Sequence, residues 1–166
     1  MIGRVEFPSM LVPTKLQVPR LPAGLVARPR LTDALERGAS GPLTLVAAPA
    51  GSGKTTLLGE WASVTSLRVA WLSLDAGDND PARFWHYVVA ALGAVRSGLG
   101  EGTLALVRAR ETDPHALAAP VLADAAEIAT PFALVLDDYH VVDHDAVHAG
   151  VSLLVERAPA SMRVVV

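Results

Sequence analysis

The sequence of 166 residues contains no cysteine, and this absence excludes a disulfide framework, a thiolate zinc site and a cysteine nucleophile. Long apolar runs are also missing. The longest uninterrupted one, residues 87–95, has only about half of the roughly 18 residues that a membrane-spanning helix needs. Because Pro8 and Pro13 interrupt the N-terminus, it has no signal-peptide layout. We therefore expect no membrane contact and a cytoplasmic location.

Lysine is scarce as well, and the chain has no net positive charge. The formal net charge is −3, and Lys15 and Lys54 are the only lysines among 14 basic residues. A face that binds nucleic acid requires a concentrated group of lysines and arginines. We therefore expect any DNA contact to lie outside these residues, and we treat the position of each lysine as informative.

Apolar residues, by contrast, are abundant. Hydrophobic residues make up 51% of the chain before its 13 glycines are added, whereas about 45–50% is usual with glycine included. Such a chain is not disordered, and its strands are expected to be buried on both faces, as in parallel sheets. Apolar runs predict strands over residues 43–48, 68–74, 132–136 and 162–166. Helices are predicted over residues 31–37, 54–64, 81–95, 115–129 and 144–157, with residues 103–112 ambiguous.

These elements predict two segments. Residues 1–30 contain five prolines, which disfavour regular helix, so we expect an extended arm that packs onto the rest of the chain. Residues 31–166 alternate strands with helices, which predicts a three-layer α/β domain with a mostly parallel sheet. Asp80 and Asp143 are expected to cap helices. The helix that starts near residue 81 is expected to end at Gly98, Gly100 and Gly102.

A glycine-rich run follows the first predicted strand and opens a helix, in the pattern of a phosphate loop whose usual first glycine is replaced by Ala48. Gly51 and Gly53 accept backbone angles that turn successive N–H groups toward an anion. Lys54 is the expected partner of the β- and γ-phosphates, and Thr55 the expected Mg²⁺ ligand. The predicted nucleotide-binding residues are Ala48, Pro49, Ala50, Gly51, Ser52, Gly53, Lys54, Thr55 and Thr56.

Two carboxylates follow the apolar strand 132–136. The carboxyl ends of parallel strands form the edge where ligands bind in open α/β sheets. We expect Asp137 to contribute to the Mg²⁺ site and Asp138 to polarise an attacking water. Asp138 and Lys54 are thus the predicted catalytic residues of a phosphate-loop NTPase.

Four segments share a resemblance that goes beyond the phosphate motifs. They are Thr14-Lys15-Leu16 with the run from Leu25 to Leu31, the loop 48–56, Trp71-Leu72-Ser73-Leu74-Asp75 with Asp78-Asn79-Asp80-Pro81 and Arg83-Phe84, and Leu134-Val135-Leu136-Asp137-Asp138-Tyr139-His140. Together they resemble the N-terminal, STAND-type ATPase domain of large LuxR-family, MalT-like transcriptional regulators, over residues 14–166.

The resemblance implies a switch that binds ATP or ADP with Mg²⁺ and hydrolyses ATP slowly. It implies self-association of the full-length protein when ATP is bound, and DNA binding only through a C-terminal helix-turn-helix that these residues lack. It also suggests that Val26 and Arg28 lie near the adenine. In such ATPases the strand after the acid strand usually inserts beside the phosphate-loop strand. We therefore expect residues 162–166 to be central and the domain 31–166 to be incomplete at its C-terminus.

Two other functions stay open at this point. A small P-loop kinase would transfer the γ-phosphate to a metabolite and would need an arginine-bearing lid, for which the arginines of residues 96–110 are the candidates. A non-catalytic interaction module would bind no nucleotide at all. An ATP titration distinguishes the module from the other two functions, and the turnover rate distinguishes the kinase from the switch.

Four further features of the sequence are expected to have structural roles. His140, His144 and His148 recur at a spacing of four, but a solvated surface is a simpler explanation than a metal site. The acidic segment 75–80 does not have the bidentate glutamate and the central glycine of a calcium loop at the required offsets, and Ser73 has no recognisable triad partners. Finally, the tryptophans are expected in the core or under the arm: Trp61, Trp71 and Trp85.

Overall fold

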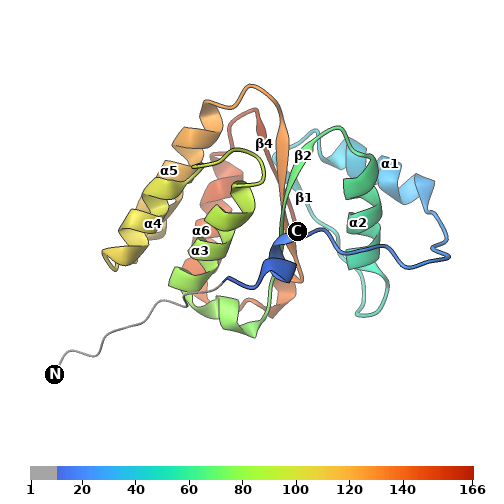
Figure 1. Ribbon diagram of the computed structural model, residues 1–166, viewed down its shortest axis with the longest axis horizontal. Helices are drawn as coiled ribbons and strands as arrows, with labels where there is room; N and C mark the ends of the chain where they lie inside the picture. Colours follow the sequence, from blue (N-terminus) through green and yellow to red (C-terminus); the bar gives the residue numbers. More distant parts are fainter. Residues whose placement is uncertain (1–10) are drawn as a thin grey trace.

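The computed structural model describes residues 11–166, and its centre is a four-stranded, all-parallel sheet in the order β1-β4-β3-β2 (Figure 1). The strands are β1 (Leu43–Thr44), β2 (Arg68–Ser73), β3 (Phe132–Asp137) and β4 (Met162–Val165). Leu134 of β3 pairs with Val164 of β4 on one side and with Ala70 of β2 on the other. The parallel α/β prediction is confirmed, and β4 does lie between the acid strand and the strand that precedes the loop.

Helices cover both faces of this sheet, which makes three layers (Figure 1). One face carries α3 (Pro81–Leu92), α4 (Glu101–Arg108), α5 (Pro114–Ala126) and α6 (Asp145–Glu156). The other carries α1 (Pro29–Gly38) and α2 (Lys54–Val64). Successive β3 side chains point to opposite faces, so Leu134 joins the larger core and Val135 the smaller one. Every residue of β3 is buried, as expected for a strand covered on both sides.

The three tryptophans are core residues, as predicted. Trp61 and Trp71 belong to the core beneath α1 and α2, and Trp85 belongs to the core beneath α3 to α6. None is more than 1% exposed. Large aromatic side chains therefore anchor both helical layers to the sheet.

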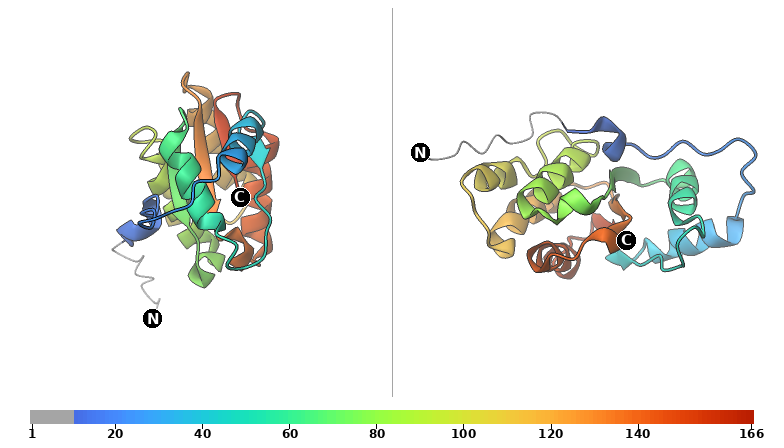
Figure 2. Two further views of the ribbon diagram at one scale, coloured as in Figure 1. Left: turned by 90° about the vertical axis from the view of Figure 1, so that its right-hand side faces the viewer. Right: turned by 90° about the horizontal axis from the view of Figure 1, so that it is seen from below.

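The N-terminal arm packs onto the domain, although it is less extended than predicted. Residues Pro13–Leu16 form a short 3-10 helix, η1, which lies against the outer edge of β2 (Figure 2). From there the chain runs across to α1, which begins at Pro29 rather than at Leu31 because proline is well accommodated in the first turn of a helix. Coverage by η1 shields the free edge of β2 from other strands. Residues 1–10 of the predicted arm lie outside the described residues.

Several predicted boundaries were wrong. β1 has two residues instead of six and is an edge strand of the described sheet. Leu43 in β1 and Leu45 just after it are 43% and 68% exposed. α3 ends at Leu92, and Gly102 lies inside α4, which occupies most of the ambiguous region. The N-cap of α6 is His144, whose Nδ1 accepts a bond from the Ala146 amide, and not Asp143. No helix among residues 11–166 is long and apolar enough to cross a bilayer.

Candidate functional site

The predicted phosphate loop connects β1 to α2. Gly51 and Gly53 have φ angles of 75° and 82°, in the left-handed region that glycine adopts without strain. Gly53 is also the N-cap of α2, so the first N–H groups of the helix have no acceptor within it and face the loop. These amides and the positive end of the helix dipole make the loop suitable for binding an anion.

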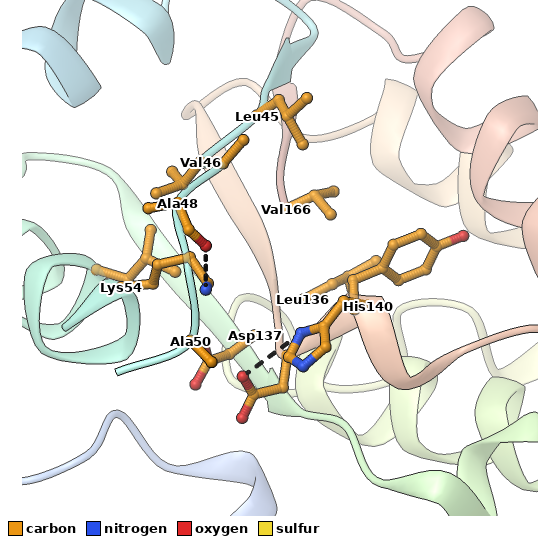
Figure 3. A pocket seen from close by; sticks show the side chains of 13 residues that line it. Leu45, Val46, Ala48, Ala50, Lys54, Leu136, Asp137, His140 and Val166 are labelled. Carbon is orange, nitrogen blue, oxygen red and sulfur yellow. Dashed lines mark hydrogen bonds and ion pairs between the residues drawn. The ribbon is translucent and has the colours of Figure 1, made fainter. Parts of the chain in front are cut away.

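Lys54 lies at the first position of α2 and folds its side chain back over the loop. Its Nζ donates to the carbonyl oxygens of Ala48, at 2.8 Å, and of Pro49, at 3.3 Å. The first of these bonds is marked in Figure 3. The ammonium group is thereby kept at the mouth of the loop, where a phosphate would need a cation.

Thr55 and Asp137 come from different elements and meet directly. The Thr55 hydroxyl donates to Asp137 Oδ1 at 3.0 Å, which joins the start of α2 to the end of β3. Burial raises the pKa of Asp137, and the bond from Thr55 only partly offsets this effect. A hydroxyl beside a carboxylate is an oxygen-donor pair of the kind that Mg²⁺ prefers, with phosphate and water completing its shell.

Asp138 follows at a sharp turn of the backbone. Its φ of 58° is unusual for a residue other than glycine, and its side chain is 47% exposed. Oδ1 lies 3.8 Å from Nδ1 of His140, in the short 3-10 helix η3 (Tyr139–Val141) (Figure 3). Burial raises the pKa of Tyr139 to about 12, and its hydroxyl lies 2.7 Å from Nδ1 of His148.

Two cavities flank the loop. The first, of about 420 Å³, is lined by apolar residues that include Leu45 and Val166 and by the charged residues Lys54, Asp137 and Asp138. Figure 3 shows this cavity. The second, of about 450 Å³, lies on the side of α1. Both share Lys54 and residues 45–48, which follow β1, so one ligand can occupy the two sides of the loop together.

The second cavity includes residues that the sequence analysis missed. Leu31, Ala34 and Leu35 project from α1 toward the loop. Their spacing of three and four was the available signal, since it marks one face of a helix. Arg28 also lines this cavity and donates from Nη1 to the Ser52 carbonyl at 3.2 Å, whereas Val26 does not line it and is 79% exposed.

The predicted nucleotide-binding residues differ in what they line. Ala48, Ala50, Ser52, Gly53 and Lys54 line one or both cavities. The rest of the run, Pro49, Gly51, Thr55 and Thr56, lines neither cavity, although Thr55 reaches Asp137.

The other groups singled out in the sequence have structural partners. His144 caps α6, and His148 contacts Tyr139. Asp75 and Asp78 bind the side chains of Lys15 and Arg83, and Asp80 caps α3. Ser73 accepts a bond from the Trp71 indole. Across residues 11–166, no group of three or more His, Cys, Asp or Glu side chains is arranged to hold a metal.

The arginines considered for a kinase lid include Arg96, which lies away from the loop. It donates to the Asp124 carbonyl of α5 at 3.1 Å and lies 3.8 Å from Glu127. Arg108 ends α4, in the helical layer on the opposite face of the sheet from α2. The contacts of Arg96 are thus with α5 and the residue that follows it, and not with the candidate site.

Comparisons with known proteins show the family to which the chain belongs. Residues 28–166 match the AAA ATPase domain family. The chain is 36% identical to the "HTH-type transcriptional regulator MalT" of Yersinia enterocolitica and of Serratia proteamaculans over 157 residues, and 34% identical to that of Yersinia pestis over 158. These matches cover 94% to 95% of this chain but only 17% of each relative. The chain belongs to the AAA ATPase domain family and is a MalT-like member of it.

Proposed function

We propose that this chain binds ATP with Mg²⁺ and hydrolyses it slowly, as the nucleotide switch of a transcriptional regulator. The observation that carries the proposal is the 3.0 Å pair between Thr55 and Asp137, which lies beside an anion-binding loop that holds Lys54. A phosphate loop alone suits many anions. The added oxygen pair provides a site for the metal that accompanies a nucleoside triphosphate.

In this proposal the nucleotide lies across the loop. The phosphates occupy the loop 48–56 and the part of the first cavity that Lys54, Asp137 and Asp138 line. The base and ribose occupy the second cavity, against Leu31 and Leu35. Apolar side chains suit the flat face of a base, and a pocket of a few hundred Å³ suits a ligand of this size.

In this proposal, different residues of the chain have different roles in hydrolysis. Loop amides and Lys54 orient the phosphates and balance their charge. Asp138, half-exposed and at the rim, accepts a hydrogen bond from the attacking water and orients it. Thr55 and Asp137 hold Mg²⁺, which when bound neutralises charge on the β- and γ-phosphates.

The regulatory part of the proposal rests on the relatives, which are named as HTH-type transcriptional regulators. This chain spans about a sixth of their length. We propose that ATP and ADP states of this module control self-association of the whole protein in the cytoplasm. DNA binding then belongs to a helix-turn-helix outside these residues, consistent with their net charge of −3.

A titration with fluorescent ATP tests nucleotide binding. Lys54→Ala should weaken binding by tenfold or more, by about 1.4 kcal/mol at least. The matched control is Arg37→Ala, which removes one positive charge from the exposed end of α1. Equal binding by Lys54→Ala and the parent protein would contradict the proposal and favour an interaction module that binds no nucleotide.

The rate of ADP release tests the switch against the kinase. A switch turns over well below about 1 per second, whereas kinases run at about 1–100 per second with their acceptor. Rapid ADP production that depends on an added metabolite would support the kinase instead.

A further inference from the structure

Asn79 is the only asparagine in the chain, and its side chain connects two turns that are far apart in the sequence. Its amide nitrogen donates to the carbonyls of Ala76, at 3.2 Å, and Val141, at 3.0 Å. Its oxygen accepts from the amides of Asp143, at 2.7 Å, and His144, at 3.1 Å. All four hydrogen-bonding positions of the side chain are therefore used.

The segment that Asn79 holds is the continuation of the Asp138 turn. Val141 donates from its backbone N–H to the Asp138 carbonyl at 3.1 Å, and its own carbonyl accepts from Asn79. Two hydrogen bonds thus lead from the Asn79 amide to the backbone of Asp138. Because Asp138 has a φ of 58°, its conformation depends on the contacts around it.

Asn79 is itself held firmly in place. It ends the 3-10 helix η2 (Ala76–Asn79), which has a capping box formed by Asp75 and Asp78. The Asp78 side chain is fully buried and bonds to Lys15 and, at 3.1 Å, to Arg83. A buried ion pair therefore fixes the short helix that ends at Asn79.

We propose that Asn79 is a positioning residue for hydrolysis, which holds the turn that carries Asp138. The proposal rests on the proposed function, because it takes Asp138 as the group that orients water. Asn79 lines neither cavity beside the loop, so it has no direct contact with nucleotide to lose. Removing its side chain should change hydrolysis while leaving the affinity for ATP intact.

The test uses the protein as its gene encodes it. Asn79→Ala should lower kcat by about tenfold to a hundredfold, the effect expected when a catalytic group moves by up to about 1 Å. The dissociation constant for ATP should stay within about twofold of the parent value. Hydrogen exchange at the amides of Asp143 and His144 should accelerate, because both lose their acceptor.

Thr103→Val is the matched control. It removes another side-chain bond to the backbone, the 2.8 Å bond from Thr103 to the Leu117 carbonyl between α4 and α5. It should leave kcat unchanged. If Asn79→Ala does not fold, Asn79→Asp replaces it. That variant keeps the acceptor for residues 143 and 144 but loses the donor to Val141, and the same fall in kcat at unchanged affinity is expected.

The outcomes separate this inference from the proposed function. A parent protein that binds no ATP overturns both. A parent protein that binds and hydrolyses ATP, with kcat unchanged in Asn79→Ala, overturns the positioning role alone. Parallel losses of kcat and ATP affinity, or an equal loss in Thr103→Val, also overturn it, because they indicate a general structural effect.

Discussion

The hydroxyl of Thr55 donates a 3.0 Å hydrogen bond to Asp137, a residue 82 positions later in the chain. The bond joins the first turn of α2 to the end of β3 and brings two candidate Mg²⁺ ligands together. Neither residue type is unusual by itself. Their contact across the carboxyl edge of the sheet is the feature on which the proposed metal-nucleotide site depends.

We predict that Thr55→Val abolishes the advantage that Mg²⁺ gives to ATP binding. The variant keeps the shape of the side chain but removes the oxygen, so affinity in Mg²⁺ should fall roughly tenfold, toward the value in EDTA. Calorimetric titration in both buffers measures this difference. Thr112→Val, in the connection between α4 and α5, changes an exposed residue and is the control; it should retain the full Mg²⁺ effect.

Asp137→Asn should stabilise the protein at neutral pH. Burial raises the pKa of Asp137 above its ordinary 3.8, so the ionised carboxylate is unfavourable in the folded state. We expect the free energy of unfolding to rise by on the order of 1 kcal/mol, at the expense of Mg²⁺ binding. Urea denaturation measures it.

The same substitution has a pH signature. In the parent protein, the contribution of the Asp137 carboxyl group to the free energy of unfolding increases as pH falls from its raised folded-state pKa toward 3.8. In this range the folded state holds a proton that the unfolded state does not hold. The difference in stability between Asp137→Asn and the parent should therefore shrink on acidification. A difference that grows instead would contradict the assigned direction.

Lys15→Met should destabilise the fold. The Lys15 and Asp78 side chains are 9% and 0% exposed, so the variant leaves a buried carboxylate with Arg83 as its remaining charged partner. Breaking a buried pair in this way costs about 3 kcal/mol. Chemical denaturation should show the loss. A midpoint within error of the parent would mean that the arm does not depend on this pair.

Asp75→Asn is the comparison for that prediction. Asp75 also contacts Lys15, at 2.9 Å, but its side chain is 52% exposed, and screening limits such a pair to less than about 1 kcal/mol. The Lys15 hydrogen bond lowers the pKa of Asp75 below 3.8. Its small contribution is therefore present above pH 3.8 and is lost as pH falls below that value.

Gly150→Ala should also destabilise the protein. A Cβ at this position of α6 would lie 2.7 Å from a ring carbon of Trp85, which is fully buried and cannot move aside. Overpacking of this kind costs about 1–3 kcal/mol. Gly41→Ala is the control, since its Cβ would meet the Gly38 carbonyl at 3.5 Å. A thermal midpoint lowered only in Gly150→Ala would match the prediction.

Much of this molecule was predictable from local sequence. The helix Lys54–Val64 was predicted with its observed bounds, because a glycine loop precedes it and apolar residues recur along it. The Asp80 cap of α3 was predicted for a similar reason, since Asp before Pro is a strong start signal. The place of β4 beside the loop strand came instead from a resemblance to related ATPases.

The sequence by itself thus determined the parallel α/β class, the loop 48–56 and the acid pair at the end of β3, because these depend on short-range patterns. Tertiary structure alone decided that Thr55 meets Asp137, that Lys15 is buried against Asp78, and that Asn79 holds the turn after Asp138. The partners in these contacts are 60 or more positions apart. Strand order and register bring these partners together. The sequence around a single residue encodes neither the strand order nor the register.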